Sequence, residues 1–197
     1  DVCSSDLFHL VETPGYPFPD LSENGGFKPR AMLYAEMQKH VAAGDTIFLS
    51  RLYLNREDPV QVLGGVDAWI AALDQFAAEM GNVGVQIVVE APTPMYGFTD
   101  IRSCLRDDPQ SCSTPRAPLE ALIGPLEDKL DAVAARHRNV RVLKLFDVLC
   151  PATDKECHPT LNGLFTMRDR DHLTVLGAYQ AMPQMLQFLG LPAHPSG

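Results

Sequence analysis

Hydrophobic and polar positions alternate along the chain between short apolar runs and longer amphipathic stretches. Three runs, at residues 46–50, 85–89 and 140–145, are nearly all apolar, with Arg141 and Lys144 interposed in the last. Apolar runs without a two-residue alternation are typical of strands that are covered on both faces, as in a parallel sheet. We therefore expect three parallel strands at these positions.

The stretches between the runs carry apolar residues at helical spacing. One such stripe extends from Val66 to Met80 and a second from Leu119 to Val133. We expect a further helix over roughly residues 30–41 and a last helix that starts at Thr174, each with its apolar stripe in the core. Strands that alternate with helices predict an α/β fold with right-handed crossovers, as in a three-layer α/β/α sandwich.

Composition narrows the class of protein. The 197 residues are 46% hydrophobic and 21% charged, which is typical of a soluble globular domain, and they suffice for one domain. The formal net charge of -9 does not favour binding to nucleic acid, so we expect no nucleic-acid partner. No apolar run approaches the roughly 20 residues that a membrane-spanning helix requires.

Four of the five cysteines form two local pairs, Cys104 with Cys112 and Cys150 with Cys157. Each pair closes a short loop, neither has the CxxC spacing of many metal sites, and only His158 lies beside a pair. We expect two structural disulfides and no metal; buried free thiols and a zinc site are the alternatives. Disulfides indicate an oxidising compartment.

The first seven residues, DVCSSDL, stand apart from the rest of the chain. They resemble translated adapter sequence at a broken end of a reading frame, and we expect residues 1–7, including the unpaired Cys3, to be foreign to the natural protein. The alternative is a genuine N-terminus. We expect one domain over residues 8–192 and a tail at 193–197.

The densest chemical signal is the segment Met167 to Thr174, which contains Asp169 and His172. An Asp three residues before a His can turn back and accept the imidazole Nδ1–H, which leaves Nε2 to take a proton from a hydroxyl nucleophile. The alternative is a solvated loop histidine. Asp171 is the other candidate acid, but adjacent loop side chains rarely face each other, so Asp169 is preferred.

A resemblance strengthens the catalytic interpretation. The segment FTMRDRDHLTVLGA resembles the last block of SGNH hydrolases, Asp-x-x-His-Leu-Ser/Thr-x-x-Gly-Ala. The segments FDVLCPATDKEC, GDTIFLSRLYLN and IVVEAPTPMY are similar to parts of the SGNH domains that are fused to acyltransferase-3 family O-acyltransferases. The resemblance covers roughly residues 8–190.

The resemblance implies a mainly parallel, flavodoxin-like SGNH sheet and a Ser-His-Asp acyl transfer without a cofactor. His172 would be the base and Asp169 would orient it. The implied acceptor is a hydroxyl of a surface or cell-wall glycan, and the acyl group would be acetyl or similar. A membrane domain of the same parent chain would relay the acyl donor. The domain would be periplasmic, tethered to the inner membrane.

One part of the family pattern is absent, because the chain contains no Gly-Asp-Ser. Gly44-Asp45-Thr46 is rejected as a substitute, since it follows a helix and opens a strand, and the Ser4-Ser5-Asp6 triplet falls in residues 1–7. We therefore expect that the first strand of the sheet, with its serine, is missing from this fragment. The fragment is expected to be inactive and poorly folded.

The oxyanion-binding residues that the resemblance implies are also incomplete. Asn55 or Arg51 is a candidate after the third family strand, and Gly25 or Gly26 after the second. Asn55 can equally be a turn residue, and His158 is interpreted as a loop residue. The alternatives for the whole domain are a carbohydrate esterase, a non-catalytic SGNH-like module that binds polysaccharide, and an unrelated α/β binding domain.

Overall fold

A parallel three-stranded sheet lies at the centre of the computed structural model, which describes residues 18–19, 29–107 and 112–191. The strands are β1 (Thr46–Leu49), β2 (Gln86–Glu90) and β4 (Val140–Leu143), in the order β1-β2-β4. Ile87 of the central strand pairs in register with Ile47 on one side and with Val140 on the other. All three predicted strands and their parallel direction are confirmed.

Two long helices, α2 (Val66–Asn82) and α4 (Arg116–Arg136), cover one face of the sheet. The predicted stripes of both helices are buried and form the main core with Ile87 and Val89. Helix α1 (Pro29–His40) also belongs to this layer, because Tyr34 packs against Phe76 of α2 at a ring-centroid distance of 5.9 Å.

The other face of the sheet is covered by the last helix, α6 (Val175–Leu189). A second, smaller core forms there from Val88 and Leu143 of the sheet and Ala181 of α6. The guanidinium carbon of Arg141 lies 4.1 Å from the ring centroid of Phe188 on the same face. Helices on both faces give the predicted three-layer α/β/α arrangement.

Coverage of this second face is uneven. Val88 and Leu143 are 2% and 0% exposed, whereas Phe48 of β1 is 39% exposed. Among the described residues, β1 pairs only with β2 and is an edge strand of the sheet. The outer edge of β1 and the adjoining part of the second face are therefore open within the described ranges.

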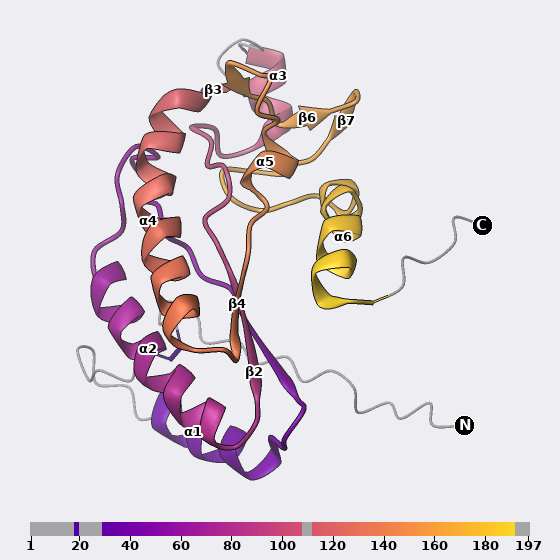
Figure 1. Ribbon diagram of the computed structural model, residues 1–197. Coiled ribbons are helices and arrows are strands. Elements are labelled where there is room, and N and C mark those ends of the chain that lie inside the picture. Colours follow the sequence, from indigo (N-terminus) through magenta and orange to yellow (C-terminus); the bar gives the residue numbers. More distant parts are fainter. Residues whose placement is uncertain (1–17, 20–28, 108–111, 192–197) are drawn as a thin grey trace.

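Short elements gather beyond the carboxyl ends of the strands (Figure 1). Their bounds follow: α3 Ile101–Asp107, β3 Thr114–Pro115, α5 Phe146–Leu149, β5 Glu156–Cys157, β6 Thr160–Leu161 and β7 Leu164–Phe165. Strand β7 forms an antiparallel hairpin with β6 and does not join the central sheet. The hairpin turns at Asn162 and Gly163, both with positive φ, as a tight two-residue turn requires.

Both predicted disulfides are present in this region. The Cα atoms lie 5.7 Å apart in Cys104–Cys112 and 4.8 Å apart in Cys150–Cys157. Strands β3 and β5 join the two cystine loops, because Thr114 pairs with Cys157. The expectations for Cys3, for residues 1–7 and for the tail at 193–197 lie outside the described residues.

Candidate active site

The Asp-x-x-His segment forms a closed loop between β7 and α6. The backbone N–H of Arg168 donates to the carbonyl of His172 at 2.8 Å, and the N–H of Thr174 donates to the carbonyl of Thr166 at 2.8 Å. Met167 and Leu173 face each other across the neck of the loop as an isolated antiparallel bridge. These bonds fix the backbone from which Asp169 and His172 project.

The start of α6 supports the loop from one side. Thr174 is the N-cap, and its Oγ1 accepts a hydrogen bond from the N–H of Gly177 at 3.0 Å. The same hydroxyl donates to the carbonyl of Phe165. A Cβ at Gly177 would lie 2.1 Å from the carbonyl oxygen of Thr166, so only glycine fits this close approach. The structure therefore explains both the Thr and the Gly of the Leu-Thr-x-x-Gly sequence: the Thr caps helix α6, and the Gly allows its close approach to the loop.

The segment that follows β2 holds the loop from another side. The N–H of Tyr96 donates to the carbonyl of Arg170 at 2.9 Å, and the N–H of Ile101 donates to the carbonyl of Arg168 at 3.1 Å. Because strands β1, β2 and β4 are parallel, the segments that follow them leave from the same edge of the sheet. The loop thus lies at the carboxyl edge, where open α/β sheets bind ligands.

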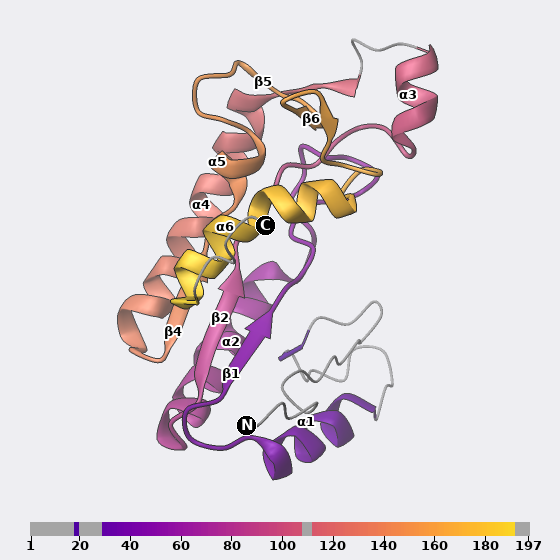
Figure 2. The same ribbon diagram turned by 90° about the vertical axis from the view of Figure 1, so that its right-hand side faces the viewer.

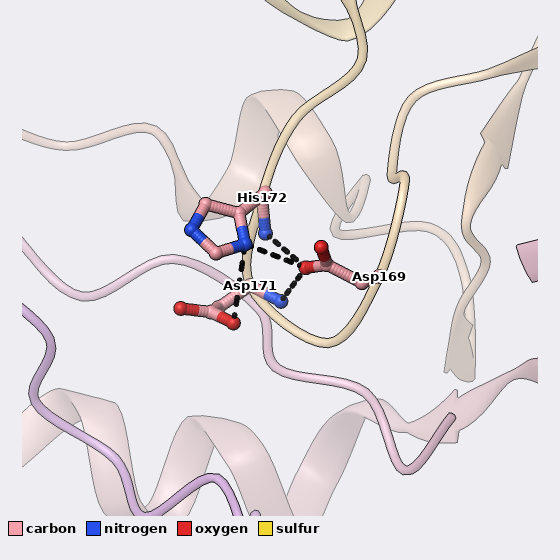
Figure 3. A group of neighbouring side chains, drawn as sticks. All are labelled: Asp169, Asp171 and His172. Atoms are coloured by element: carbon pink, nitrogen blue, oxygen red, sulfur yellow. Dashed lines mark hydrogen bonds and ion pairs between the residues drawn. The ribbon is translucent and has the colours of Figure 1, made fainter. Parts of the chain in front are cut away.

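Asp169 and His172 are in direct contact within this loop (Figure 3). Oδ1 of Asp169 lies 2.8 Å from Nδ1 of His172, and it also accepts from the backbone N–H groups of His172 at 3.0 Å and Asp171 at 3.3 Å. The other ring nitrogen, Nε2, points away from Asp169 and has no hydrogen-bond partner among the described residues. The His172 side chain is 50% exposed, so Nε2 is accessible to a reacting group.

The surroundings favour the ionised form of Asp169. Partial burial by itself would raise the pKa of Asp169, but the hydrogen bonds from the backbone and imidazole of His172 outweigh it. The N–H of Asp171 and the side chain of Arg168 act in the same direction. The net effect lowers the pKa of Asp169 below its ordinary value, which suits an acid that orients and stabilises an imidazolium.

Asp171 also approaches the imidazole, although its neighbouring position in the loop argued against this. Its Oδ1 lies 3.7 Å from Nδ1 of His172, compared with 2.8 Å for Asp169. Arg56, in the segment between β1 and α2, binds both carboxylate oxygens of Asp171, with Nη2–Oδ2 at 2.7 Å and Nε–Oδ1 at 3.1 Å. The sequence did not indicate this contact, because a charged residue in a polar loop gives no local signal of a partner 115 positions away.

One cluster in the described part of the chain has the residue types for a cation. Ligand atoms of Asp169, Asp171 and His172 all lie within 4.8 Å of one another. However, Arg56 already binds the Asp171 carboxylate, and Nδ1 of His172 is hydrogen-bonded to Asp169. The contacts describe a hydrogen-bonded acid–imidazole pair, and His158 is not part of this cluster.

The candidate oxyanion residues occupy other surroundings. Asn55 donates its amide N–H to Oε1 of Gln61 at 2.8 Å and accepts from the N–H of Glu57 at 3.0 Å, as a turn residue does. The guanidinium carbon of Arg51 lies 4.8 Å from the ring centroid of Trp69. An oxyanion role for either residue remains a prediction, and Gly25 and Gly26 lie outside the described residues.

Two further residues singled out from the sequence, Thr46 and His158, were not expected to take part in catalysis. Thr46 is the first residue of β1 and therefore lies at the amino end of the strand, away from the carboxyl edge. His158 is an exposed loop residue whose Nδ1 lies 2.7 Å from Oγ of Ser113.

Comparisons with known proteins identify the family of the chain. The family model for the SGNH domain (fused to AT3 domains) matches residues 8–187. The chain belongs to this family. A search of curated protein sequences gives no match.

Two solved structures resemble the SGNH chain. One is the lipopolysaccharide acetyltransferase periplasmic domain of Salmonella ser. Paratyphi A, with a TM-score of 0.53 and 13% identity over 74% of this chain and 56% of that one. The other is described as a "putative platelet activating factor" from Streptococcus pneumonia, with a TM-score of 0.48 and 16% identity over 80% of this chain and 65% of that one. The SGNH chain thus spans less than two thirds of either structure. At this identity the first likeness supports the fold alone.

The fold class expected for an SGNH domain is therefore confirmed. Within the described ranges, none of its helices combines the length and the apolar character needed to cross a bilayer.

Replacement of Gly177 by alanine should disturb the Asp-x-x-His loop. The added Cβ meets a backbone oxygen at 2.1 Å, so helix α6 or the loop must shift, at a cost of about 1–3 kcal/mol or more. Gly124→Ala in α4 is the matched control, because its Cβ would meet nothing within 4 Å and alanine favours a helix. Urea unfolding of the chain preceded by its natural upstream segment should show a loss for Gly177→Ala and no loss for Gly124→Ala; equal midpoints would contradict the packing argument.

The carboxyl group of Asp169 should titrate below the ordinary range of aspartate. Because its pKa is lowered in the folded protein, its contacts stabilise the loop fully above the unfolded pKa, and this stability is lost as pH falls through the lowered pKa. Carbon-13 NMR of the side-chain carboxyl measures the titration directly. His172→Ala should move the pKa back towards the ordinary value. A pKa at or above the ordinary value in the protein without the substitution would show that the hydrogen bonds do not outweigh the effect of burial.

Proposed function

We propose that the chain supplies the acid–base half of a serine acyl-transfer site, with His172 as the base and Asp169 as its orienting acid. The supporting observation is the 2.8 Å contact between Asp169 and Nδ1 of His172, which leaves Nε2 accessible, in a chain of the SGNH family. The reaction is transfer of an acyl group, acetyl or similar, to a sugar hydroxyl of a surface or cell-wall glycan.

In the first half of the reaction, a serine hydroxyl attacks the carbonyl carbon of the acyl donor while Nε2 of His172 takes the hydroxyl proton. The tetrahedral intermediate collapses, the bond to the leaving group breaks, and Nε2 gives its proton to that group. The products are the acyl-serine ester and the protonated leaving group. Asp169 remains ionised throughout and stabilises the imidazolium through Nδ1.

In the second half, a sugar hydroxyl attacks the acyl-serine carbonyl while Nε2 takes its proton. Collapse of the second intermediate releases the sugar ester and returns the proton to the serine oxygen. Every proton in this sequence passes through His172, so the proposal assigns no cofactor. If water replaces the sugar, the same steps give hydrolysis, and the domain is then a carbohydrate esterase.

The nucleophile is proposed to lie at the carboxyl end of a strand that pairs with the open edge of β1. The 197 residues contain no Gly-Asp-Ser, and β1 has a free edge among the described residues. Phe48, 39% exposed on the less covered face, offers an apolar surface for the helix that would follow such a strand. A parallel strand in this position would end at the same edge as the loop of His172.

The setting of the reaction is proposed to be extracytoplasmic, with a membrane domain of the same parent protein relaying the acyl donor. The two disulfides support an oxidising compartment, because such bonds are rare in the cytosol. The description of the family as fused to AT3 domains supports a larger parent protein.

Restoring the proposed strand and helix should restore both folding and activity. The described residues leave the edge and the adjoining face of β1 open, so the chain alone is expected to melt without cooperativity and to turn over no p-nitrophenyl ester. The same chain preceded by its natural upstream segment should melt cooperatively and hydrolyse the ester. Cooperative melting and ester turnover by the shorter chain would place the nucleophile within these 197 residues instead.

His172→Ala in the full-length natural protein should lower acyl transfer by roughly 10³-fold or more, because the serine loses its base and its proton donor. His158→Ala is the matched control, since it removes an exposed loop histidine and should leave transfer near the parent rate. Transfer of labelled acetyl to glycan and release of free acetate are measured together. Loss of both only in His172→Ala supports the proposal, and acetate release without transfer identifies an esterase. Parent-like binding of polysaccharide with no turnover in any variant identifies a non-catalytic module.

A further inference from the structure

Two carboxylates, not one, lie beside the imidazole of His172. Asp169 makes the short contact at 2.8 Å, and Oδ1 of Asp171 lies 3.7 Å from the same nitrogen, Nδ1. The Asp171 side chain is only 13% exposed, so water screens its charge poorly. Figure 3 shows a contact from each of the two carboxylates to Nδ1, the ring nitrogen that faces the loop.

A second carboxylate is a disadvantage for a base that must take up and release a proton in every half-reaction. Each negative charge near an imidazole favours its protonated form. An imidazole that stays protonated cannot accept the proton of a hydroxyl nucleophile, so the fraction of active base falls. The charge of Asp171 therefore has to be offset if only Asp169 is to act on His172.

Arg56 is placed to provide that offset. Its Nε lies 3.1 Å from Oδ1 and 3.0 Å from Oδ2 of Asp171, and its Nη2 lies 2.7 Å from Oδ2. This side-on contact engages both oxygens of the carboxylate. The pKa of Arg56 lies above its ordinary value, mainly because of the hydrogen bond with Asp171, and its positive charge is therefore permanent.

The carbonyl oxygen of Arg56 adds a second link to the same loop, because it accepts a hydrogen bond from Nη1 of Arg170. Arg56 precedes helix α2, whereas Asp171 precedes helix α6 on the opposite face of the sheet. The contact therefore joins segments from both helical layers beside the candidate site.

We propose that Arg56 is a positioning residue that neutralises Asp171, so that Asp169 alone acts on the imidazole of His172. This inference rests on the proposed function, because it concerns the protonation of the same base. Arg56 touches neither His172 nor the reacting atoms; it acts through Asp171.

Other charged groups around the ring do not replace Arg56. Arg168 pairs with Asp169 at 3.2 Å, and its side chain is 66% exposed. Arg170 pairs weakly with Glu57 at 3.8 Å. The charged groups that face this loop among the described residues are Arg56, Glu57, Arg168, Asp169, Arg170 and Asp171.

The protonation of His172 can be measured without catalysis. Of the two protonation states of histidine, diethyl pyrocarbonate modifies only the one with the uncharged imidazole. Its rate of reaction at His172, followed by peptide mass spectrometry over a range of pH, therefore reports the uptake of the proton. The full-length natural protein is used. Arg56→Gln should raise the pH of half-maximal modification by roughly 0.5 to 1 unit, because the Asp171 charge is then no longer offset.

Two further variants separate charge from shape. Arg56→Lys keeps the positive charge but loses the two-point contact, and it should stay closer to the parent midpoint than to that of Arg56→Gln. Arg56→Gln combined with Asp171→Asn removes both charges and should return the midpoint to that of the parent. His158, measured in the same digests, should not move in any variant. A purely structural ion pair predicts the opposite: Arg56→Lys would behave like Arg56→Gln, and the double variant would not be rescued.

Acyl transfer by the same variants distinguishes failure of this inference from failure of the proposed function. With an active parent, Arg56→Gln should lower kcat at neutral pH more than it changes KM, and the double variant should recover kcat. If no variant, including the parent, transfers acyl groups, the proposed function is wrong, while the modification profile still decides the role of Arg56. An unchanged midpoint in Arg56→Gln overturns the inference.

Discussion

The parallel pairing of β1, β2 and β4 is the constraint on which the rest of the structure depends. Parallel strands require crossover helices, and both faces of the sheet must then be covered. The same direction also sends the segments after all three strands to one edge. The segments after β1 and β2 meet the Asp-x-x-His loop there, through Arg56 and through the N–H groups of Tyr96 and Ile101. The position of the candidate site follows from strand direction before any side chain is considered.

Within that site, most contacts that fix the loop are made by the backbone. Bonds from Tyr96, Ile101 and Thr174 hold the main chain, and the N–H of His172 holds Asp169. Gly177 allows α6 to approach closely enough for the N-cap of Thr174 to form beside the loop. The main chain thus sets the positions from which the side chains of Asp169 and His172 project. The local part of these contacts lies within the short block from Thr166 to Gly177, and the N–H groups of Tyr96 and Ile101 add the rest.

The sequence predicted those features that depend on local pattern. The three strands followed from apolar runs, helix α6 from its periodicity and from Thr174, and the two disulfides from short cysteine spacings. The expectation that the apolar stripe of α6 lies in the core was wrong in part, because Tyr179 and Met182 are exposed. The contact of Asp169 with His172 was predictable because they are three positions apart in the sequence. The pairing of Arg56 with Asp171 was not, because it joins segments 115 positions apart through the tertiary fold. The hairpin of β6 and β7 was not predicted either, because each of its strands has only two residues and gives no pattern along the sequence.

Covalent labelling tests the central claim, that His172 and Asp169 serve a serine nucleophile, most directly. A fluorophosphonate reacts only with a serine that a neighbouring base activates, and mass spectrometry locates the adduct. In the full-length natural protein, the account predicts one labelled serine, on a strand beside β1, and loss of labelling in His172→Ala with the fold retained. Labelling at an undiminished rate in His172→Ala, or labelling of no serine in an active protein, would contradict it.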